Sequence, residues 1–166
     1  LRRQRCPRHK AASYYASMEG HWEVVKWLHI TGKALANAHT FVHAAQMNNI
    51  EMVKWLYNKR CVWSNQALTV AITGGHTQLV HWMIEHNFPS DENTVNAAVN
   101  KGDCKLVDLL IKHGAPKSVD AYTIAATNND FIMIEYLDWL NFPLSSATLT
   151  ACYTEEISKW VQHRLN

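Results

Sequence analysis

The sequence is rich in side chains that bind metal ions. It contains ten His and four Cys among 166 residues. A zinc site needs several Cys or His side chains that converge at ligand spacing. His39 and His43 lie four residues apart on one expected helix face, and His81 and His86 lie near a following loop, but neither pair has a Cys nearby. The four Cys form no Cys-x-x-Cys pair. The sequence therefore predicts no metal site.

Catalytic motifs are also missing from the sequence. A catalytic thiol needs a base beside it, and no such base accompanies the four Cys, which are Cys6, Cys61, Cys104 and Cys152. The chain has no Gly-rich phosphate loop, no His-Glu-x-x-His or Gly-x-Ser-x-Gly motif, and no paired carboxylates. We therefore expect a protein that is not an enzyme and that has neither catalytic residues nor a cofactor.

Positive charge gathers at the start of the chain. Residues 1–33 hold seven basic and two acidic side chains, a net charge of +5, whereas residues 34–166 hold nine basic and twelve acidic ones, a net charge of −3. A basic end can contact nucleic acid. Nucleic-acid-binding modules usually spread basic residues over the whole binding face, however, and this chain becomes acidic along its length. We therefore interpret residues 1–4 as the remnant of a preceding structural unit, and we do not expect a nucleic-acid partner.

The overall composition is that of a folded domain. Hydrophobic residues make up 48% of the chain and charged residues 18%, which excludes a disordered polypeptide. Polar residues interrupt every apolar run before it reaches the roughly 18 residues of a membrane-spanning helix, so no membrane association is expected. The scattered Cys form no disulfide framework and favour a reducing, intracellular and cytoplasmic setting.

An internal repeat is the most informative feature of the sequence. Five ten-residue segments align without gaps and start at offsets of 28, 27, 27 and 27 residues: 20–29, 48–57, 75–84, 102–111 and 129–138. A shortened sixth copy occupies residues 155–162. The sequence thus predicts a single array over residues 1–166 with units at roughly 5–31, 32–59, 60–86, 87–113, 114–140 and 141–166.

The columns of this alignment predict two turns in each unit. The first column contains only Gly and Asn, which tolerate a left-handed backbone: Gly20, Asn48, Gly75, Gly102 and Asn129. The second holds Gly or Asn at four of five positions: Gly32, Arg60, Asn87, Gly114 and Asn141. Two residues after the last three of these positions come Pro89, Pro116 and Pro143, whereas Val62 follows Arg60 at that place. Each unit is therefore expected to be helix, tight turn, helix and loop, which makes the fold all-α.

Apolar residues between the turns follow helical spacing. In the first helices, a large residue is followed three positions later by a small one, as in Phe41 and Ala44. In the second helices, the column of Trp27, Trp55 and Trp82 is expected to lie in the core rather than to stack on a ligand. Helix N-caps are predicted at Ser64, Asp91 and Ser145, and polar caps at the turn by His21 and His76.

This pattern resembles the ankyrin repeat, which runs Ala-Ala-x-x-Gly-His, Val-Val-x-x-Leu-Leu and Gly-Ala. Residues 44–49 and 107–115 fit that template without gaps. The resemblance implies an ankyrin-like α-solenoid of about six helix-turn-helix units. Two departures stand out: Thr or Ala replaces the Pro of the helix start, and the period is 27 rather than 33 residues. The missing residues fall where ankyrin repeats carry a β-hairpin, so the hairpin is expected to be absent or reduced. This short form, with its Lys-Trp-Leu tripeptides, is similar to arrays of amoebal giant viruses, protists and oomycetes.

The resemblance also implies a role and a surface. Ankyrin arrays are scaffolds that bind a partner protein or peptide in a concave groove, and this array is expected to be a monomer or part of a larger chain. The groove is implied to be lined by the residues after the Ala pair and by loop tips: Gln46, Met47, Trp63, Thr73, Asn100, Lys101, Lys117, Thr127 and Asn128. Trp63 has a rival role in packing against the next unit. Two alternatives remain, namely a nucleic-acid-binding repeat that uses its basic end and a structural segment of a longer array.

Overall fold

The computed structural model describes residues 11–32, 34–151 and 154–165, and every regular element within these ranges is a helix. The chain divides into two compact units, one ending at His81 and the other beginning at Trp82. This division falls inside one helix, which contributes residues to both units. The predicted all-α class is confirmed, and no strand replaces the missing hairpin in the described ranges. The single array over residues 1–166 stays a prediction.

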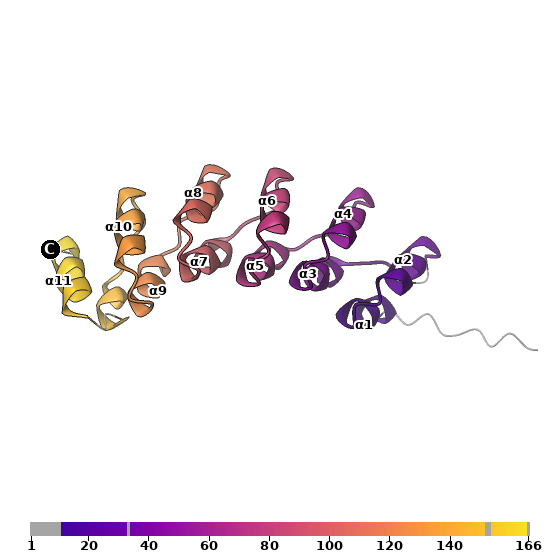
Figure 1. The fold of residues 1–166 in the computed structure, drawn as a ribbon, viewed down its shortest axis with the longest axis horizontal. Helices are drawn as coiled ribbons and strands as arrows, with labels where there is room; N and C mark the ends of the chain where they lie inside the picture. The colour runs from indigo at the N-terminus through magenta and orange to yellow at the C-terminus, as the bar shows by residue number, and fades with distance from the viewer. Residues whose placement is uncertain (1–10, 33, 152–153, 166) are drawn as a thin grey trace, which may run out of the picture. The chain divides into compact units, whose positions relative to one another are not determined.

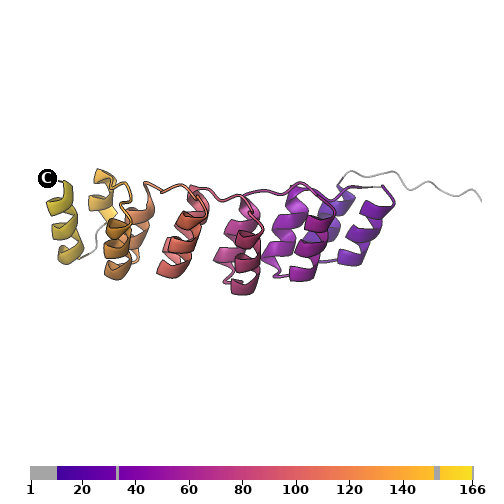
Figure 2. The same cartoon turned by 90° about the horizontal axis from the view of Figure 1, so that it is seen from above.

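The first unit is built from helix pairs. Its first helices are α1 (Ala12–Met18), α3 (Ala38–Gln46) and α5 (Gln66–Thr73), and its second helices are α2 (Trp22–Ile30), α4 (Ile50–Asn58) and the start of α6 (Thr77–Glu85). Helix α3 packs between α1 and α5, so the three first helices form one layer. Helices α2 and α4 belong to a second layer above it (Figures 1 and 2).

The second unit repeats this plan and then departs from it. Its helices are α7 (Glu92–Asn100), α8 (Cys104–Lys112), α9 (Ala121–Thr127), α10 (Phe131–Trp139) and α11 (Glu155–Leu165). Helix α7 packs on α9, as in the first unit. The expected α-helix before α11 is instead a short 3-10 helix, η1 (Ser146–Ala151). Within η1, the Thr150 hydroxyl donates to the carbonyl of Ala147, three residues earlier, at 2.7 Å.

All ten residues of the two predicted turn columns adopt a left-handed backbone, with φ between 53° and 86°. Arg60, the exception in residue type, has φ 53° like its equivalents. Each turn also closes the helix before it. After α4, for example, the Cys61 NH donates to the Leu56 carbonyl at 3.1 Å, and the Arg60 NH donates to the Tyr57 carbonyl at 2.9 Å. The predicted turns are thus confirmed, including the one that lacks Gly or Asn.

The first helices begin at a column of polar caps. The side-chain oxygens of Asn37 and Asp91 cap α3 and α7, where they accept the backbone NH three residues later at 3.3 and 2.9 Å. The hydroxyls of three Ser each accept the backbone NH two residues later at 3.1 to 3.3 Å: Ser64, Ser118 and Ser145. The N-cap predicted at Ser64 lies one residue later, at Asn65. Thr40 and Thr94 complete capping boxes with Asn37 and Asp91. These Thr occupy the position that holds Pro in the ankyrin template. In this chain, a capping box therefore starts the helix in place of the Pro.

The core lies between the first and second helices of each repeat. The column of small residues is fully buried, with 0% exposure at Ala44, Ala71, Ala98 and Ala125. The core prediction for Trp27 was wrong, because this side chain is 51% exposed. Trp55, its equivalent, contacts His29 of the preceding repeat with ring centroids 5.3 Å apart. No repeat precedes Trp27 among the described residues, so α2 has no such neighbour.

No helix in the described part of the chain combines the length and apolar character needed to cross a bilayer.

Candidate functional site

A row of exposed side chains lies at the C-terminal ends of the first helices in the first unit. Three residues of the predicted surface belong to it, namely Gln46, Met47 and Thr73, and Met47 is 48% exposed. The equivalent positions of α1 hold Met18 and Glu19, which are also exposed. The sequence analysis missed these two, although the alignment on Gly20 places them in the same columns.

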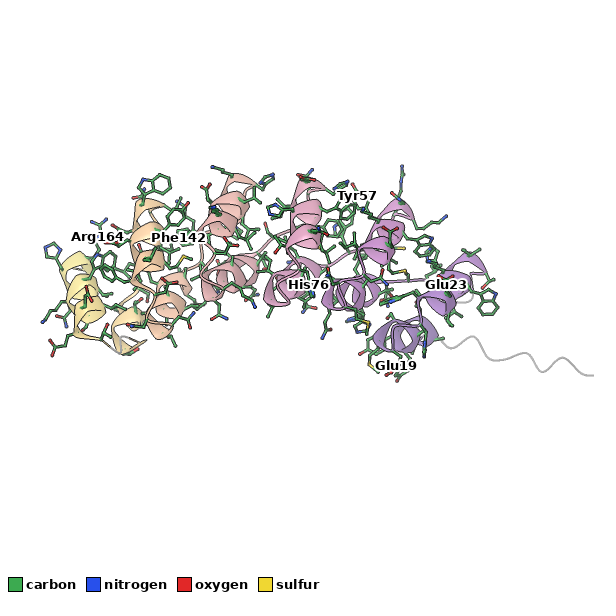
Figure 3. The ribbon with its side chains drawn as sticks, in the orientation of Figure 1. Glu19, Glu23, Tyr57, His76, Phe142 and Arg164 are labelled. Carbon is green, nitrogen blue, oxygen red and sulfur yellow. The ribbon has the colours of Figure 1, made fainter. Side chains whose placement is uncertain are left out.

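Contacts between successive repeats hold this row in place. The Met47 thioether lies over the turn before it, where a Cβ on Gly20 would come within 3.4 Å of its sulfur. His76 reaches back from the next repeat, and its Nε2 lies 3.1 Å from the Gln46 carbonyl oxygen (Figure 3). Because a carbonyl only accepts, Nε2 carries the hydrogen. Gly74 makes room for this ring, since a Cβ there would overlap it.

The two His of the turn position therefore behave differently from the prediction. At the start of the second helix, the side chains of Asn49, Asp103 and Asp130, which share this turn position, accept a backbone NH at 2.9 to 3.0 Å and cap the helix. His21 makes no such bond, so its predicted capping role was wrong. His76 instead bonds to a carbonyl at the end of α3. An imidazole offers one acceptor nitrogen at most, whereas Asn and Asp offer an oxygen on a short side chain.

The second unit carries an equivalent row of exposed residues. It consists of Asn100, Lys101, Thr127 and Asn128, at the C-terminal ends of α7 and α9. The Asn128 amide donates to the Asn100 side-chain oxygen at 3.1 Å, which joins neighbouring repeats. The structure thus brings together the predicted residues of each unit on the ends of adjacent helices.

Some predicted residues already have partners within the chain. The Lys117 ammonium donates to the Leu140 and Asn141 carbonyls at 2.6 and 3.3 Å, so it caps the C-terminal end of α10. The Thr73 and Thr127 hydroxyls donate to carbonyls one helical turn earlier, at 2.8 and 2.7 Å. Those Thr therefore offer a partner mainly their methyl groups.

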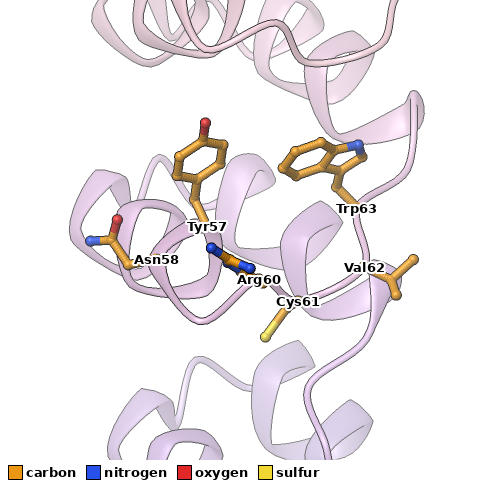
Figure 4. A pocket seen from close by; sticks show the side chains of 6 residues that line it. All are labelled: Tyr57, Asn58, Arg60, Cys61, Val62 and Trp63. Atoms are coloured by element: carbon orange, nitrogen blue, oxygen red, sulfur yellow. The ribbon is translucent and has the colours of Figure 1, made fainter.

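Trp63 lies in a separate hollow of about 590 Å³ at the end of α4. Tyr57, Asn58, Arg60, Cys61, Val62 and Trp63 line it (Figure 4). The Trp63 ring stacks on Tyr57, with centroids 5.6 Å apart and planes 10° from parallel. It also lies in a T-shaped arrangement with Phe41, with ring centroids 6.4 Å apart. Trp63 is still 37% exposed. Both roles considered for Trp63, packing and contact with a partner, are compatible with this position.

Cys61 and His29 lie side by side and form structural contacts. Cys61 is buried with its sulfur 4.0 Å from His29 Nδ1, and burial raises the pKa of its thiol, which keeps it protonated and unreactive. His29 Nδ1 accepts the Ala36 NH at 3.2 Å, so it has no free lone pair. Among the described residues, no group of three or more His, Cys, Asp or Glu could hold a metal ion.

Paired helices, joined by left-handed turns and stacked through their first helices, define the class of α-helical repeat proteins. A family model described as ankyrin repeats (three copies) matches residues 9–96 and, in an overlapping match, residues 41–123. Together these matches span residues 9–123, which is 115 of the 166 residues, and the chain belongs to the ankyrin repeat family. Ankyrin repeats are generally protein–protein interaction modules and typically lack enzymatic activity. No curated protein matches the chain.

Proposed function

We propose that this protein is a non-catalytic scaffold that binds a partner protein or peptide through the exposed ends of its first helices. In ankyrin arrays these positions face the concave groove. One observation carries the proposal: chemically diverse, exposed side chains lie two and three residues after a column of Ala with 0% exposure. The buried Ala fix the helix spacing, while the exposed residues differ from repeat to repeat. Such a surface offers specific recognition on a rigid support.

The chemistry of the two rows suggests contacts of different character. In the first unit, Met18 and Met47 provide flexible, polarizable apolar area, and Glu19 adds one negative charge. In the second unit, Asn100, Asn128 and Lys101 are polar or positive. We expect the first row to contact apolar groups of a partner and the second to contact acidic or hydrogen-bonding groups. Location inside the cell, in the cytoplasm, stays a prediction.

The proposal is tested by capturing partners on the immobilised protein after nuclease treatment and in about 0.2 M salt, which weakens nucleic-acid contacts. One variant carries Gln46→Ala and Met47→Ala, and a second carries Lys101→Ala and Asn128→Ala. If these residues bind, each variant should retain a captured protein at least about tenfold more weakly, because central interface residues each contribute more than 1 kcal/mol.

A matched control carries Gln78→Ala and Lys105→Ala, two exposed positions on second helices. It should capture the same protein as the unaltered chain. Equal retention by the control and by both row variants would contradict the proposal. Retention of nucleic acid alone, released by moderate salt, would instead favour the basic end within residues 1–10, which lies outside the described residues.

A further inference from the structure

The hollow at the end of α4 departs from the repeat pattern at three of its lining positions. Arg60 stands where the equivalent turn positions hold Gly or Asn, Val62 stands where the three following repeats have Pro, and Trp63 stands where those three repeats have Ser, Lys and Leu. The first two changes oppose stability. A non-Gly residue with φ 53° costs roughly 1–2 kcal/mol, and loss of the Pro leaves the exit from the helix less restricted. Strained positions of this kind cluster at binding sites.

The guanidinium of Arg60 offers the charge for a ligand. Arg60 is exposed, and within the described ranges no carboxylate pairs with it. Among the described residues that line the hollow, it is the only one with a cationic side chain. A single planar guanidinium matches the two oxygens of a carboxylate in a bidentate pair, whereas phosphate sites usually gather more than one cation.

Two aromatic rings offer an apolar wall beside that charge. Figure 4 shows the Tyr57 and Trp63 rings on the same side of the loop, with the Cys61 sulfur on the other side. Because Trp63 is stacked on Tyr57 and supported by Phe41, it presents its exposed part in a fixed orientation. A rigid aromatic group of this kind gives contact area at a low cost in side-chain entropy.

We infer that this hollow is a second binding site, which takes a peptide segment with a carboxylate next to an aromatic side chain. The carboxylate pairs with the Arg60 guanidinium, and the aromatic group packs on the exposed part of Trp63. The carboxylate comes either from an acidic side chain or from the C-terminus of the partner. The site uses the end of a second helix and the following loop, whereas the proposed function uses the ends of the first helices. The inference is therefore independent of the proposed function.

The test is a nuclear magnetic resonance titration of the whole 15N-labelled chain with three short probes. The first is acetyl-Glu-Phe amide, the second acetyl-Gln-Phe amide, and the third acetyl-Gln-Phe with a free C-terminal carboxylate. We expect the first or third probe to shift the Trp63 indole NH and the backbone amides of residues 57–63. A dissociation constant of about 0.1–1 mM is expected for such small ligands. The neutral second probe should bind at least about tenfold more weakly, since it loses a charge-assisted bond.

Arg60→Gln and the adjacent Lys59→Gln form the matched pair of variants. Both remove one exposed positive charge, and Arg60→Gln keeps a non-Gly residue in the left-handed turn. Arg60→Gln should abolish the difference between charged and neutral probes, and Lys59→Gln should preserve it. Equal binding of all three probes, equal effects of the two variants, or no shifts in residues 57–63 at about 10 mM probe would overturn the inference. The capture experiment above is unaffected by any of these results.

Discussion

Replacing Arg60 by Gly should make the protein more stable, although it removes a side chain from the lining of a hollow. Arg60 has φ 53° at the left-handed turn after α4, and its side chain is exposed. The two hydrogen bonds that close this turn use the backbone NH groups of Arg60 and Cys61. Gly preserves both bonds, so the substitution changes only the conformational preference of the residue and the side-chain contacts in the hollow.

The expected gain follows from two opposing contributions. Relief of the left-handed conformation contributes roughly 1–2 kcal/mol. The greater freedom of Gly in the unfolded chain offsets about 0.4–1 kcal/mol of this. The free energy of unfolding should therefore rise by about 0.5–1 kcal/mol, which corresponds to an increase in Tm of about 1–4 °C for a domain of this size.

Urea unfolding followed by circular dichroism measures this change, with Lys59→Gly as the control. Lys59 has φ −81° at the neighbouring position, where Gly brings only its entropic cost. Lys59→Gly should therefore lower the free energy of unfolding by about 0.5–1 kcal/mol. Arg60→Asn should stabilise the protein less than Arg60→Gly does. A decrease in stability for Arg60→Gly, or equal effects of the two Gly variants, would refute this account of the turn.

Three further predictions concern other contacts. Asp91→Ala should lower the free energy of unfolding by about 1 kcal/mol, as measured by urea unfolding, because the α7 N-cap and its capping box are lost; Asp91→Asn should cost clearly less. Burial, and then the neighbouring His39, lower the pKa of His43 below its ordinary 6.5, so on acidification the unfolded chain takes up this proton first. The free energy of unfolding that neutral His43 contributes should be complete above about pH 6.5 and lost as the pH falls through the folded-state pKa. The urea midpoint of the His43→Gln variant, measured at several pH values, should therefore depend less on pH than that of the unaltered protein. An unchanged dependence would contradict this prediction. Gly74→Ala should stabilise a His76→Ala variant by about 0.4–1 kcal/mol. It should stabilise the unaltered protein by less, because there the new methyl group must displace the His76 imidazole. Equal effects in thermal unfolding would show that the contact between His76 and Gln46 does not contribute to stability.

Much of the fold could be predicted because its determinants are local and repeat at a fixed spacing. A Gly or Asn at the same point of successive repeats has one simple explanation, a left-handed turn, and all ten positions have that backbone. Even Arg60 could be placed correctly, since its neighbours in the alignment determine its role. The 3-10 helix η1 could not be predicted, because the repeat pattern gives the position of a first helix but not its hydrogen-bond pattern.

The candidate site was harder to predict because exposure depends on neighbours in space. Trp27 and Trp55 share a column, yet only Trp55 has a described preceding repeat beside it. Lys117 belongs to the column of loop tips, but its length allows it to reach the end of α10, a contact that no spacing rule contains. Tyr57 was missed for a similar reason: its stacking on Trp63 joins the end of a helix to the loop that follows.

The left-handed turns also bear on how such a gene can change in length. Each turn satisfies the backbone of its own helix end, as the Asn49 NH does by donating to the Ala44 carbonyl at 2.8 Å. A duplication or deletion of one whole period therefore leaves no helix end without its closing hydrogen bonds, wherever within the period the break occurs. Insertion or deletion of any other number of residues within a helix would move the turn residues out of register, whereas the loop between the first two copies accommodates the one extra residue of the 28-residue offset. Selection on foldability alone would thus preserve the 27-residue period while the number of repeats varies.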